Sequence, residues 1–166
     1  MNIFFLDKTP EKSAEYHCDK HVVKMILETA QMLSTAINKY AMGIDESRLY
    51  KTAHPKHPST LWIGKTRTNF MWGLKLGQEL SKEYTKRYGK KHKSSNIIDN
   101  IIESKYYEVI PNGDLTKPPL CMPEECKRDC YVFSYRKYYK EYKYKFAKWD
   151  KLNNTPYWWS EQWKHI

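Results

Sequence analysis

Residues 16–33 have the sequence YHCDKHVVKMILETAQML, and their apolar side chains recur every three or four positions. That period is typical of a helix with one buried face. Upstream, Thr9 or Asp7 can cap such a helix, and Pro10 suits its first turn. We therefore predict one long helix that starts near residue 9 and ends near Asn38. Its expected core stripe consists of Val22, Ile26, Ala30, Leu33 and Ile37.

The polar side chains of the same segment also follow helical spacing. They are separated by steps of three or four residues, so they should share one face of the helix. We predict that they form a ridge opposite the core stripe. A row of positive side chains can hold the phosphate of a substrate, and a carboxylate at the end of the row can then act as a general acid on that substrate. An ordinary water-facing helix surface has the same spacing, and this alternative stays open. The ridge residues are His17, His21, Lys24, Glu28, Gln31 and Thr35.

Histidines in this region raise the alternative of a metal site. His17 and His21 are four residues apart, which lets two imidazoles reach one ion, and His54 or His57 could complete the set. No glutamate directly follows His17, so the metalloprotease pattern is absent. The cysteines of CMPEECKRDC do not have the spacing of paired zinc ligands and are expected to be reduced thiols. We expect no bound metal and no other cofactor.

The rest of the chain shows helical patterns separated by long loops. We predict a second helix over about residues 60–88, a short one within 96–107 and a last one over about 129–149. Gly73 and Gly77 lie on the buried stripe of the second helix, which indicates close approach of another helix. Segment 109–125 contains four prolines and is expected to be a surface loop. The predicted fold class is all-α: a compact single-domain bundle of about three to five helices over residues 1–166, with long Pro-rich loops.

The last predicted helix and the tail are rich in aromatic residues and lysine. Spacing predicts that Tyr135, Tyr138 and Tyr142 belong to the core. Other side chains of this region lie off that stripe or in the tail and are candidates for contact with a nucleic acid. For the tail tryptophans, packing is an equal alternative. These candidates are Lys137, Tyr139, Lys140, Trp158 and Trp159.

Charge and aromatic content limit the class of partner. The chain of 166 residues has a formal net charge of +10, and 15% of its residues are aromatic. Cations interleaved with aromatic rings suit phosphates and bases, so the expected partner is a nucleic acid. No apolar run is long enough to span a membrane, and the first residues do not resemble a signal peptide. We expect a cytoplasmic monomer that binds no membrane, in the host cytoplasm if a phage encodes it.

Three patches of the sequence resemble the phage and bacterial pyrimidine-dimer DNA glycosylases. In CDKHVVKMILE, Asp19 and His21 are followed by Glu28, at the place of the family's catalytic glutamate. The segment beginning HPSTLWIGKTRTNF is similar to the family's His-Pro segment and long central helix. The basic, Tyr-rich last helix followed by NNTPYWW is similar to its closing segment. The resemblance implies a small all-α DNA-repair enzyme whose N-terminus reaches the active site.

The resemblance also implies a mechanism. In this family an N-terminal α-amine attacks the sugar carbon that bears a damaged base, the base leaves, and a Schiff base leads to strand scission by β-elimination. An unperturbed α-amine has a pKa of roughly 7.7 to 8.0, so part of it is neutral at physiological pH. The implied catalytic residues are Met1 as nucleophile, Glu28 as acid or electrostatic catalyst, and His21 as a group that orients phosphate or sugar. Implied contacts with double-stranded DNA, including a flipped nucleotide, involve Asn2, His17, Lys20, Lys24, Gln31 and Arg67.

The sequence differs from the family pattern in three ways. The spacing from the terminus to Glu28 is longer, through an insert around PEKSAEYH. Asn2 normally leaves the initiator methionine in place, so the amine would be that of Met1. The arginines that surround the family's glutamate are also replaced, which leaves a damaged or modified base other than a pyrimidine dimer as an alternative. The replacing residues are Lys24, Ile26, Leu27 and Gln31.

Two other functions stay open at this point. One is a non-catalytic nucleic-acid-binding protein, and the other is a different base- or nucleotide-directed enzyme, including a metal-dependent one. Amine chemistry requires Met1 within a few ångströms of Glu28, whereas a binder needs no such meeting. The metal alternative requires His17, His21 and a third ligand to converge.

Overall fold

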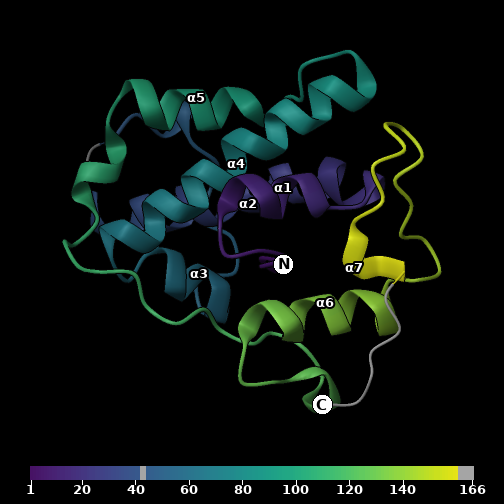
Figure 1. Cartoon of the computed structure of the whole chain (residues 1–166). Helices are drawn as coiled ribbons and strands as arrows, with labels where there is room; N and C mark the ends of the chain where they lie inside the picture. Colours follow the sequence, from purple (N-terminus) through teal and green to yellow (C-terminus); the bar gives the residue numbers. More distant parts are fainter. Residues whose placement is uncertain (42–43, 161–166) are drawn as a thin grey trace.

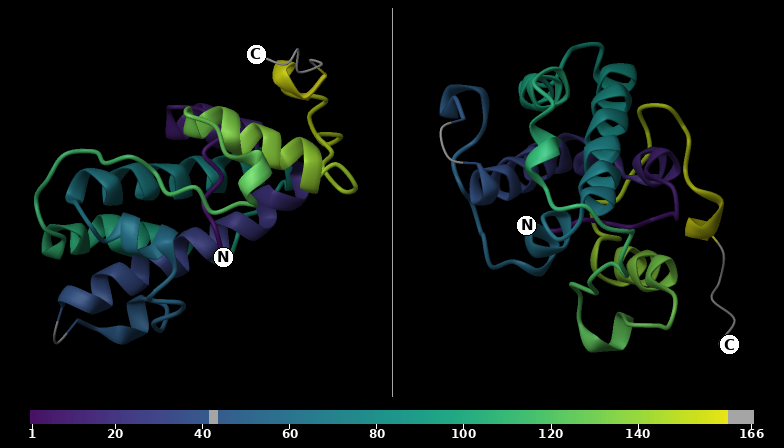
Figure 2. Two further views of the ribbon diagram at one scale, coloured as in Figure 1. Left: turned by 90° about the horizontal axis from the view of Figure 1, so that it is seen from below. Right: turned by 90° about the vertical axis from the view of Figure 1, so that its left-hand side faces the viewer.

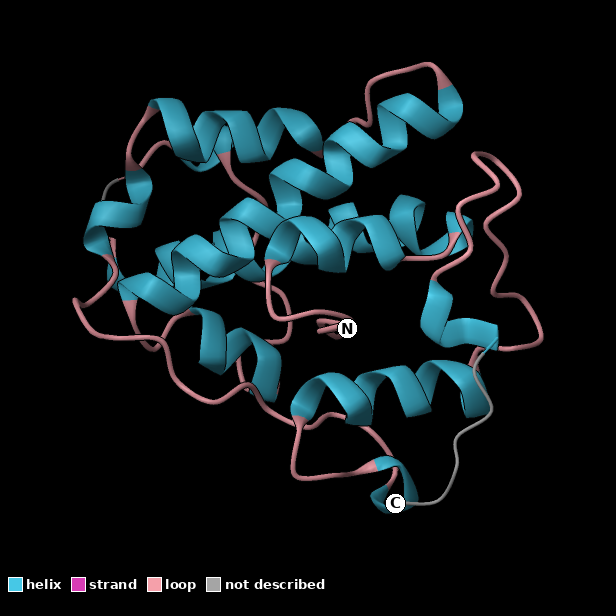
Figure 3. Ribbon diagram, in the orientation of Figure 1, coloured by secondary structure: helices cyan, strands magenta, loops and turns pink. Residues whose placement is uncertain are grey.

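The computed structural model describes residues 1–41 and 44–160, and within those ranges it is helical without any strand (Figure 1 and Figure 3). The predicted all-α class is therefore confirmed. None of the helices in these ranges is long and apolar enough to cross a membrane. In chain order the elements are α1 (Pro10–Tyr16), α2 (Asp19–Tyr40), η1 (Glu46–Arg48), α3 (Pro58–Ile63), α4 (Arg67–Tyr88), α5 (Ser95–Glu103), η2 (Tyr106–Val109), η3 (Glu124–Cys126), α6 (Tyr131–Tyr142) and α7 (Tyr157–Ser160).

Helices α2 and α4 are the two longest elements, and they pack against each other at the centre of the fold. All five predicted stripe positions of α2 are buried, as are Phe70, Leu80 and Tyr84 on α4. These side chains belong to one hydrophobic cluster that also takes in the N-terminal segment and part of the tail. The spacing of apolar residues therefore predicted the buried faces of both central helices correctly.

Two glycines allow this close packing. A Cβ at Gly77 would lie 2.8 Å from Ile98 Cδ1 on α5 and 3.3 Å from Thr29 Cγ2 on α2. One turn earlier, a Cβ at Gly73 would lie 2.9 Å from Ile63 Cδ1 on α3. The predicted close approach is confirmed, and α3 and α5 take part in it as well as α2.

We expect Gly77→Leu to lower the free energy of unfolding by about 1–3 kcal/mol, because a large side chain overpacks the junction of α2, α4 and α5. Urea denaturation measures this change. Lys82→Leu is the matched control, since Lys82 lies on the same helix with its side chain 62% exposed. That variant should change the free energy by less than about 0.5 kcal/mol. Similar effects at the two positions would contradict the packing described.

The helix predicted over residues 9–38 is in fact two helices, with a break at His17 and Cys18. The guanidinium of Arg87 donates to the His17 carbonyl at 2.7 Å and to the Glu15 carbonyl at 3.0 Å. The last carbonyls of a helix have no partner within it, and Arg87 supplies one here. Because this residue lies 70 positions beyond His17, local spacing could not have predicted the break.

The other two long predictions were also too long. A break after Gly64 separates α3 from α4, and the Thr66 hydroxyl caps α4 by accepting from the Asn69 N–H at 3.1 Å. Helix α6 ends at Tyr142 rather than near residue 149. The described ranges therefore hold seven α-helices, whereas about three to five were predicted. The four predicted helices correspond to α2, α4, α5 and α6, and the shorter α1, α3 and α7 are additional.

The N-terminal segment crosses the interior of the fold without regular secondary structure. Its four apolar residues, Ile3 to Leu6, are at most 5% exposed. The Ser13 hydroxyl donates to the Phe4 carbonyl at 2.9 Å, and Arg136 donates to the Leu6 carbonyl at 2.8 Å. This segment carries the start of the chain to a position close to α2 and α3 (Figure 1 and Figure 2).

Candidate active site

The α-amine of the chain lies beside a carboxylate of α2. The nitrogen of Met1 is 3.8 Å from Glu28 Oε2, and the N–H of Asn2 donates to the same oxygen at 3.0 Å. The Met1 side chain is 3% exposed and that of Glu28 12% exposed, while Met1 as a whole residue is half-buried. The start of the chain is therefore held against Glu28 by the protein and is not a loose end.

Asn2 holds this end of the chain from several sides. Its Nδ2 donates to the Cys121 carbonyl at 3.0 Å, in the Pro-rich loop. Its Oδ1 accepts from the hydroxyls of Ser59 on α3 and Tyr135 on α6, each at 3.4 Å. Since the backbone N–H is bound to Glu28, four separate parts of the fold determine where the α-amine lies.

Two further groups set the electrostatics around Glu28. Lys24 Nζ is 3.4 Å from Glu28 Oε1, on a side chain that is 65% exposed. His57 caps α3 by accepting the Ser59 N–H at 3.2 Å. Burial lowers the pKa of His57, and the positive charges of the amino terminus and of His54 lower it further. A carboxylate placed between two amines can take a proton from one of them and stabilise a cation that forms there.

Four of the predicted site residues meet at this point, namely Met1, Asn2, Lys24 and Glu28. Gln31 lies about one turn further along α2 and is half-buried. Lys20 lies one turn before Lys24 and is exposed, with its Nζ 5.2 Å from the centre of the Phe146 ring. These two side chains lie on either side of the meeting point along α2.

His17 and His21 lie in the interior, which corrects the predicted water-facing ridge. His17 is completely buried, and its Nδ1 donates to the Ser13 carbonyl at 2.6 Å. His21 is 5% exposed, and its Nδ1 is hydrogen-bonded to the Tyr139 hydroxyl. The ring of Phe4 stacks on His21 with centroids 4.6 Å apart, so the N-terminal segment covers this face of α2. The burial of both histidines is at odds with their predicted contact with phosphate or sugar.

Burial keeps these two histidines neutral, and this predicts a pH dependence of stability. It lowers the pKa of His17 to about 4 and that of His21 to about 2. A histidine of the unfolded chain titrates near 6.5, so below that pH the unfolded state binds protons that the folded state does not. We expect the free energy of unfolding to fall as the pH is lowered from about 6.5 towards 4, by up to about 1.4 kcal/mol per pH unit for each histidine.

Urea denaturation between about pH 5 and pH 7 measures this dependence. His17→Asn should remove a large part of the slope, because one of the two groups that titrate differently in the folded and unfolded states is lost. His54→Asn is the control, since His54 is exposed and has a φ of 48°, which asparagine tolerates. An unchanged slope in His17→Asn would show that this imidazole is not the source.

Three aromatic or basic side chains predicted to contact DNA have structural roles. Arg67 donates to the carbonyls of Glu108 at 2.7 Å and Ile110 at 3.2 Å, which fastens the loop that follows η2. Trp158 is 1% exposed and Tyr139 is completely buried, because the tail folds back over α6. Neither ring is placed to stack on a base, so the predicted roles of Trp158 and Tyr139 are corrected, whereas DNA contact by the half-buried Arg67 stays a prediction.

The remaining candidates of the last segment are only partly covered. Lys137 is 22% exposed and forms an ion pair with Glu141, while Lys140 and Trp159 are half-buried. Trp159 packs on Trp149 with ring centroids 4.9 Å apart. Of the predicted core stripe of this helix, Tyr135 is buried, but Tyr142 is 44% exposed, which is a further correction. The buried face of α6 therefore runs through positions 135 and 139.

The geometry does not favour the metal alternative. The rings of His17 and His21 have centroids 6.5 Å apart, and each ring uses its Nδ1 in a hydrogen bond. In residues 1–41 and 44–160, no group of three or more His, Cys, Asp or Glu side chains is placed to hold a metal ion. The four cysteines are free thiols. Among the described residues, no third ligand converges on the two histidines.

Four residues near the α-amine were not predicted as members of one site: His57, Ser59, Cys121 and Tyr135. His57 appeared only as a possible metal ligand and Tyr135 only as a core residue. They come from α3, the Pro-rich loop and α6, and no local pattern connects these segments. The one available signal was Pro58, because proline at the first position of a helix places the preceding residue at the cap.

No known protein family, curated protein or solved structure matches this chain in sequence or fold. The chemistry that the site offers is that of an α-amine held against a carboxylate.

Proposed function

We propose that this protein is a DNA glycosylase with an associated abasic-site lyase activity, and that the α-amine of Met1 is its nucleophile. The observation that carries the proposal is the 3.8 Å contact between this amine and Glu28. The mechanism implied by the family resemblance depends on that meeting. A protein that only binds nucleic acid has no need of a buried N-terminal segment that delivers its amine to a carboxylate.

In the proposed reaction the amine nitrogen bonds to C1′ of a deoxyribose as the bond from C1′ to the base breaks. The base leaves with a proton, the sugar ring opens, and the amine and C1′ are joined as a Schiff base. Loss of a proton from C2′ then breaks the C3′–oxygen bond by β-elimination, and water finally releases the sugar from the amine. Glu28 accepts the proton that the amine must lose and stabilises the positive charge that develops at C1′.

A basic groove borders this site and supports DNA as the partner. It runs between the start of α2 and residues 146–151, and its lining includes Lys20, Lys24, Lys148 and Lys151. Lys24 belongs both to the groove and to the surroundings of Glu28. Such a groove suits the phosphates of a strand. The partner we propose is double-stranded DNA with a damaged or modified base, bound by a single copy of the chain.

Acidic side chains do not cancel the charge of this groove. Asp19 and Asp150 also line it, but Asp19 is paired with Arg87 at 3.1 Å. The rings of Phe146 and Tyr88 lie beneath two of the lysines, with Lys151 Nζ 5.3 Å from the centre of Tyr88. Aromatic rings can stack on the bases of a nucleic acid, and the neighbouring cations can contact its phosphates.

Borohydride trapping tests the proposal. The protein is incubated with three duplexes that contain an abasic site, a cyclobutane pyrimidine dimer or no damage. We expect a covalent adduct at the abasic site and at the lesion that the protein excises, and none on undamaged DNA. Intact-mass analysis with peptide mapping should place the adduct on the amine of Met1.

An N-terminal extension provides the decisive variant. One extra residue before Met1 moves the free amine by up to about 3.5 Å from its place beside Glu28. We expect this protein to lose the adduct, while the same residue added at the other end of the chain leaves trapping unchanged. Trapping at the same rate with the extended N-terminus would exclude Met1 as the nucleophile.

A nucleic-acid-binding protein without catalysis is the second candidate, and the basic groove favours it. Lys148→Ala should reduce the slope of log K against log salt concentration for duplex binding by about 0.9, the contribution of one phosphate contact. Lys105→Asn is the control: Lys105 is exposed, precedes η2 near the start of α4 and away from Tyr88, and has a φ of 52°, which asparagine tolerates. It should leave the slope unchanged. Salt-sensitive binding with these differences, but no adduct on any duplex, would select this candidate over the enzyme.

A further inference from the structure

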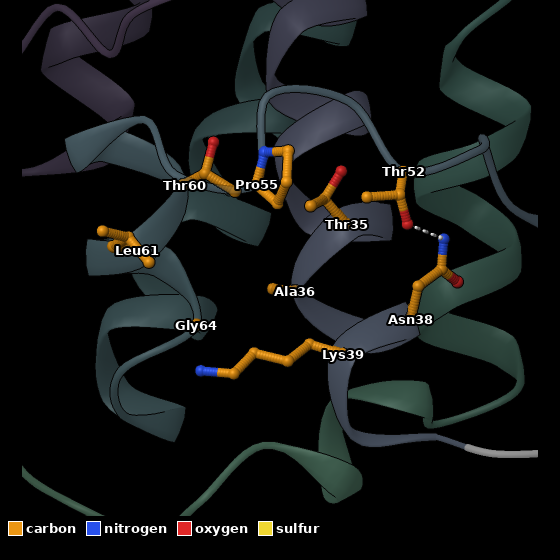
Figure 4. Close-up of a pocket in the computed structure, with 9 residues that line it drawn as sticks. All are labelled: Thr35, Ala36, Asn38, Lys39, Thr52, Pro55, Thr60, Leu61 and Gly64. Atoms are coloured by element: carbon orange, nitrogen blue, oxygen red, sulfur yellow. Dashed lines mark hydrogen bonds between the residues drawn. The ribbon is translucent and has the colours of Figure 1, made fainter.

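A pocket opens next to the α-amine on the side away from the basic groove. It lies between α2, α3 and residues 52–55 and has a volume of about 250 Å³ (Figure 4). Thr60 connects the pocket to the start of the chain, because Thr60 is one of its lining residues and its hydroxyl lies 3.6 Å from the sulfur of Met1. Along α2 the groove, Glu28 and the pocket follow one another, and Glu28 and Thr35 are about 10 Å apart along the helix axis. That distance is comparable with the length of a sugar and its base.

The walls of the pocket are apolar, and its edge is polar. Ala36, Pro55 and Leu61 supply the apolar surface, and Figure 4 shows Lys39 extending along one side towards Gly64. Among the described residues that line the pocket there is no acid, so Lys39 is its charged group. A ligand that fits must be small and mostly apolar, and it must offer acceptor atoms to an ammonium group.

We infer that this pocket receives the base of a nucleotide turned out of the duplex, and that it prefers bases with carbonyl groups, such as thymine or uracil, to adenine. The choice of a base as the ligand rests on the proposed function. The volume is below the usual range for drug-sized molecules, which suits one base and excludes a base pair. Flipped bases are held between apolar side chains and recognised by hydrogen bonds at their edges.

The preference follows from the donors at the edge of the pocket. The ammonium group of Lys39 only donates hydrogen bonds, and a carbonyl oxygen of thymine or uracil accepts them. Adenine has an amino donor beside its acceptor ring nitrogen and no carbonyl oxygen, so its edge is less favourable to an ammonium group than that of thymine or uracil, where two carbonyl oxygens accept. The Asn38 amide does not replace Lys39, because its Nδ2 already donates to the Tyr50 carbonyl at 3.1 Å and to the Thr52 hydroxyl at 3.4 Å.

Titration of the ¹⁵N-labelled protein with thymidine and with deoxyadenosine tests this inference without any catalytic step. Thymidine should shift the amide signals of Ala36, Lys39 and Leu61, and deoxyadenosine should bind more weakly. Lys39→Met should weaken thymidine binding about tenfold, the size of one hydrogen bond to a charged group, and should weaken deoxyadenosine binding by a smaller factor. Lys90→Met is the control for the loss of one positive charge.

Leu61→Ala is a second variant that should keep the fold, because Leu61 is 52% exposed. It removes an apolar wall and should weaken the binding of both nucleosides. Equal affinity for the two nucleosides, or shifts only at residues outside the pocket, would overturn the inference. Covalent trapping on DNA without nucleoside binding would also overturn it while leaving the proposed function standing. Nucleoside binding at these residues without trapping would support the pocket and count against the lyase.

Discussion

Glu28→Gln is expected to reduce borohydride trapping and strand scission at an abasic site by about 10²- to 10⁴-fold, the usual contribution of a general acid or base. Glutamine keeps an oxygen that can accept the Asn2 N–H, which lies 3.0 Å from the carboxylate in the native protein. The start of the chain should therefore stay in place. The variant loses the negative charge beside the α-amine, and with it both the proton acceptor and the stabilisation of a cation at C1′. Single-turnover rates on an abasic duplex measure the effect.

Duplex binding by Glu28→Gln should be unchanged or somewhat tighter, because one negative charge is removed next to Lys24. Glu124→Gln is the matched control, since the Glu124 side chain is 85% exposed and lies in η3, and its rates should equal those of the native protein. A Glu28→Gln protein that binds the duplex and traps at the native rate would show that the carboxylate only anchors the N-terminus. The proposed chemistry would then lack its acid–base partner.

Much of the framework around Glu28 could be predicted from sequence, because it depends on local periodicity. The stripe from Val22 to Ile37 is buried as its spacing predicts. Glu28 lies off that stripe, but it is 9% exposed rather than on a water-facing ridge, and its carboxylate accepts the N–H of Asn2. The meeting with Met1 was implied only by the family resemblance, since no spacing within the chain relates its first residue to α2.

Long-range packing explains what the sequence could not predict. The polar face of α2 was expected to face water, but Phe4 covers it and the imidazole of His21 bonds to the hydroxyl of Tyr139. A histidine at helical spacing has the same pattern whether its partner is water or a side chain from α6. The residues predicted for the site therefore include Glu28, which lies beside the α-amine, and also His17 and His21, which lie in the core.

Helix α6 shows the same difficulty in another form. Its tyrosines occur so often that more than one stripe can be drawn through them, and spacing alone favoured positions 135, 138 and 142. The protein buries Tyr135 and Tyr139 completely and leaves Tyr142 largely exposed. Which stripe is buried depends on where the N-terminal segment and the tail pack against α6. The periodicity of the helix does not predict either of these positions.

Arg87→Met should have the largest effect on stability, and we expect it to lower the free energy of unfolding by about 3–5 kcal/mol. The guanidinium is completely buried and is paired with Glu83 at 3.0 Å and with Asp19 at 3.1 Å. It also caps the carbonyls at the end of α1. Methionine fills much of the space but leaves the Glu83 carboxylate, whose side chain is 8% exposed, with less compensation for its charge. Urea denaturation at pH 7 measures the change.

Lys86→Met is the matched control for this prediction, because Lys86 pairs with the same carboxylate at 3.1 Å but is 64% exposed. Exposed ion pairs contribute little, so its cost should be at most about 1 kcal/mol. Adding Glu83→Gln to Arg87→Met should recover part of the loss, since the buried charge is removed together with its partner. Equal costs for the two single variants would mean that the burial of Arg87 has no energetic consequence. A large cost for Arg87→Met alone would show that the buried guanidinium stabilises the fold through its ion pairs and its hydrogen bonds to the carbonyls at the end of α1.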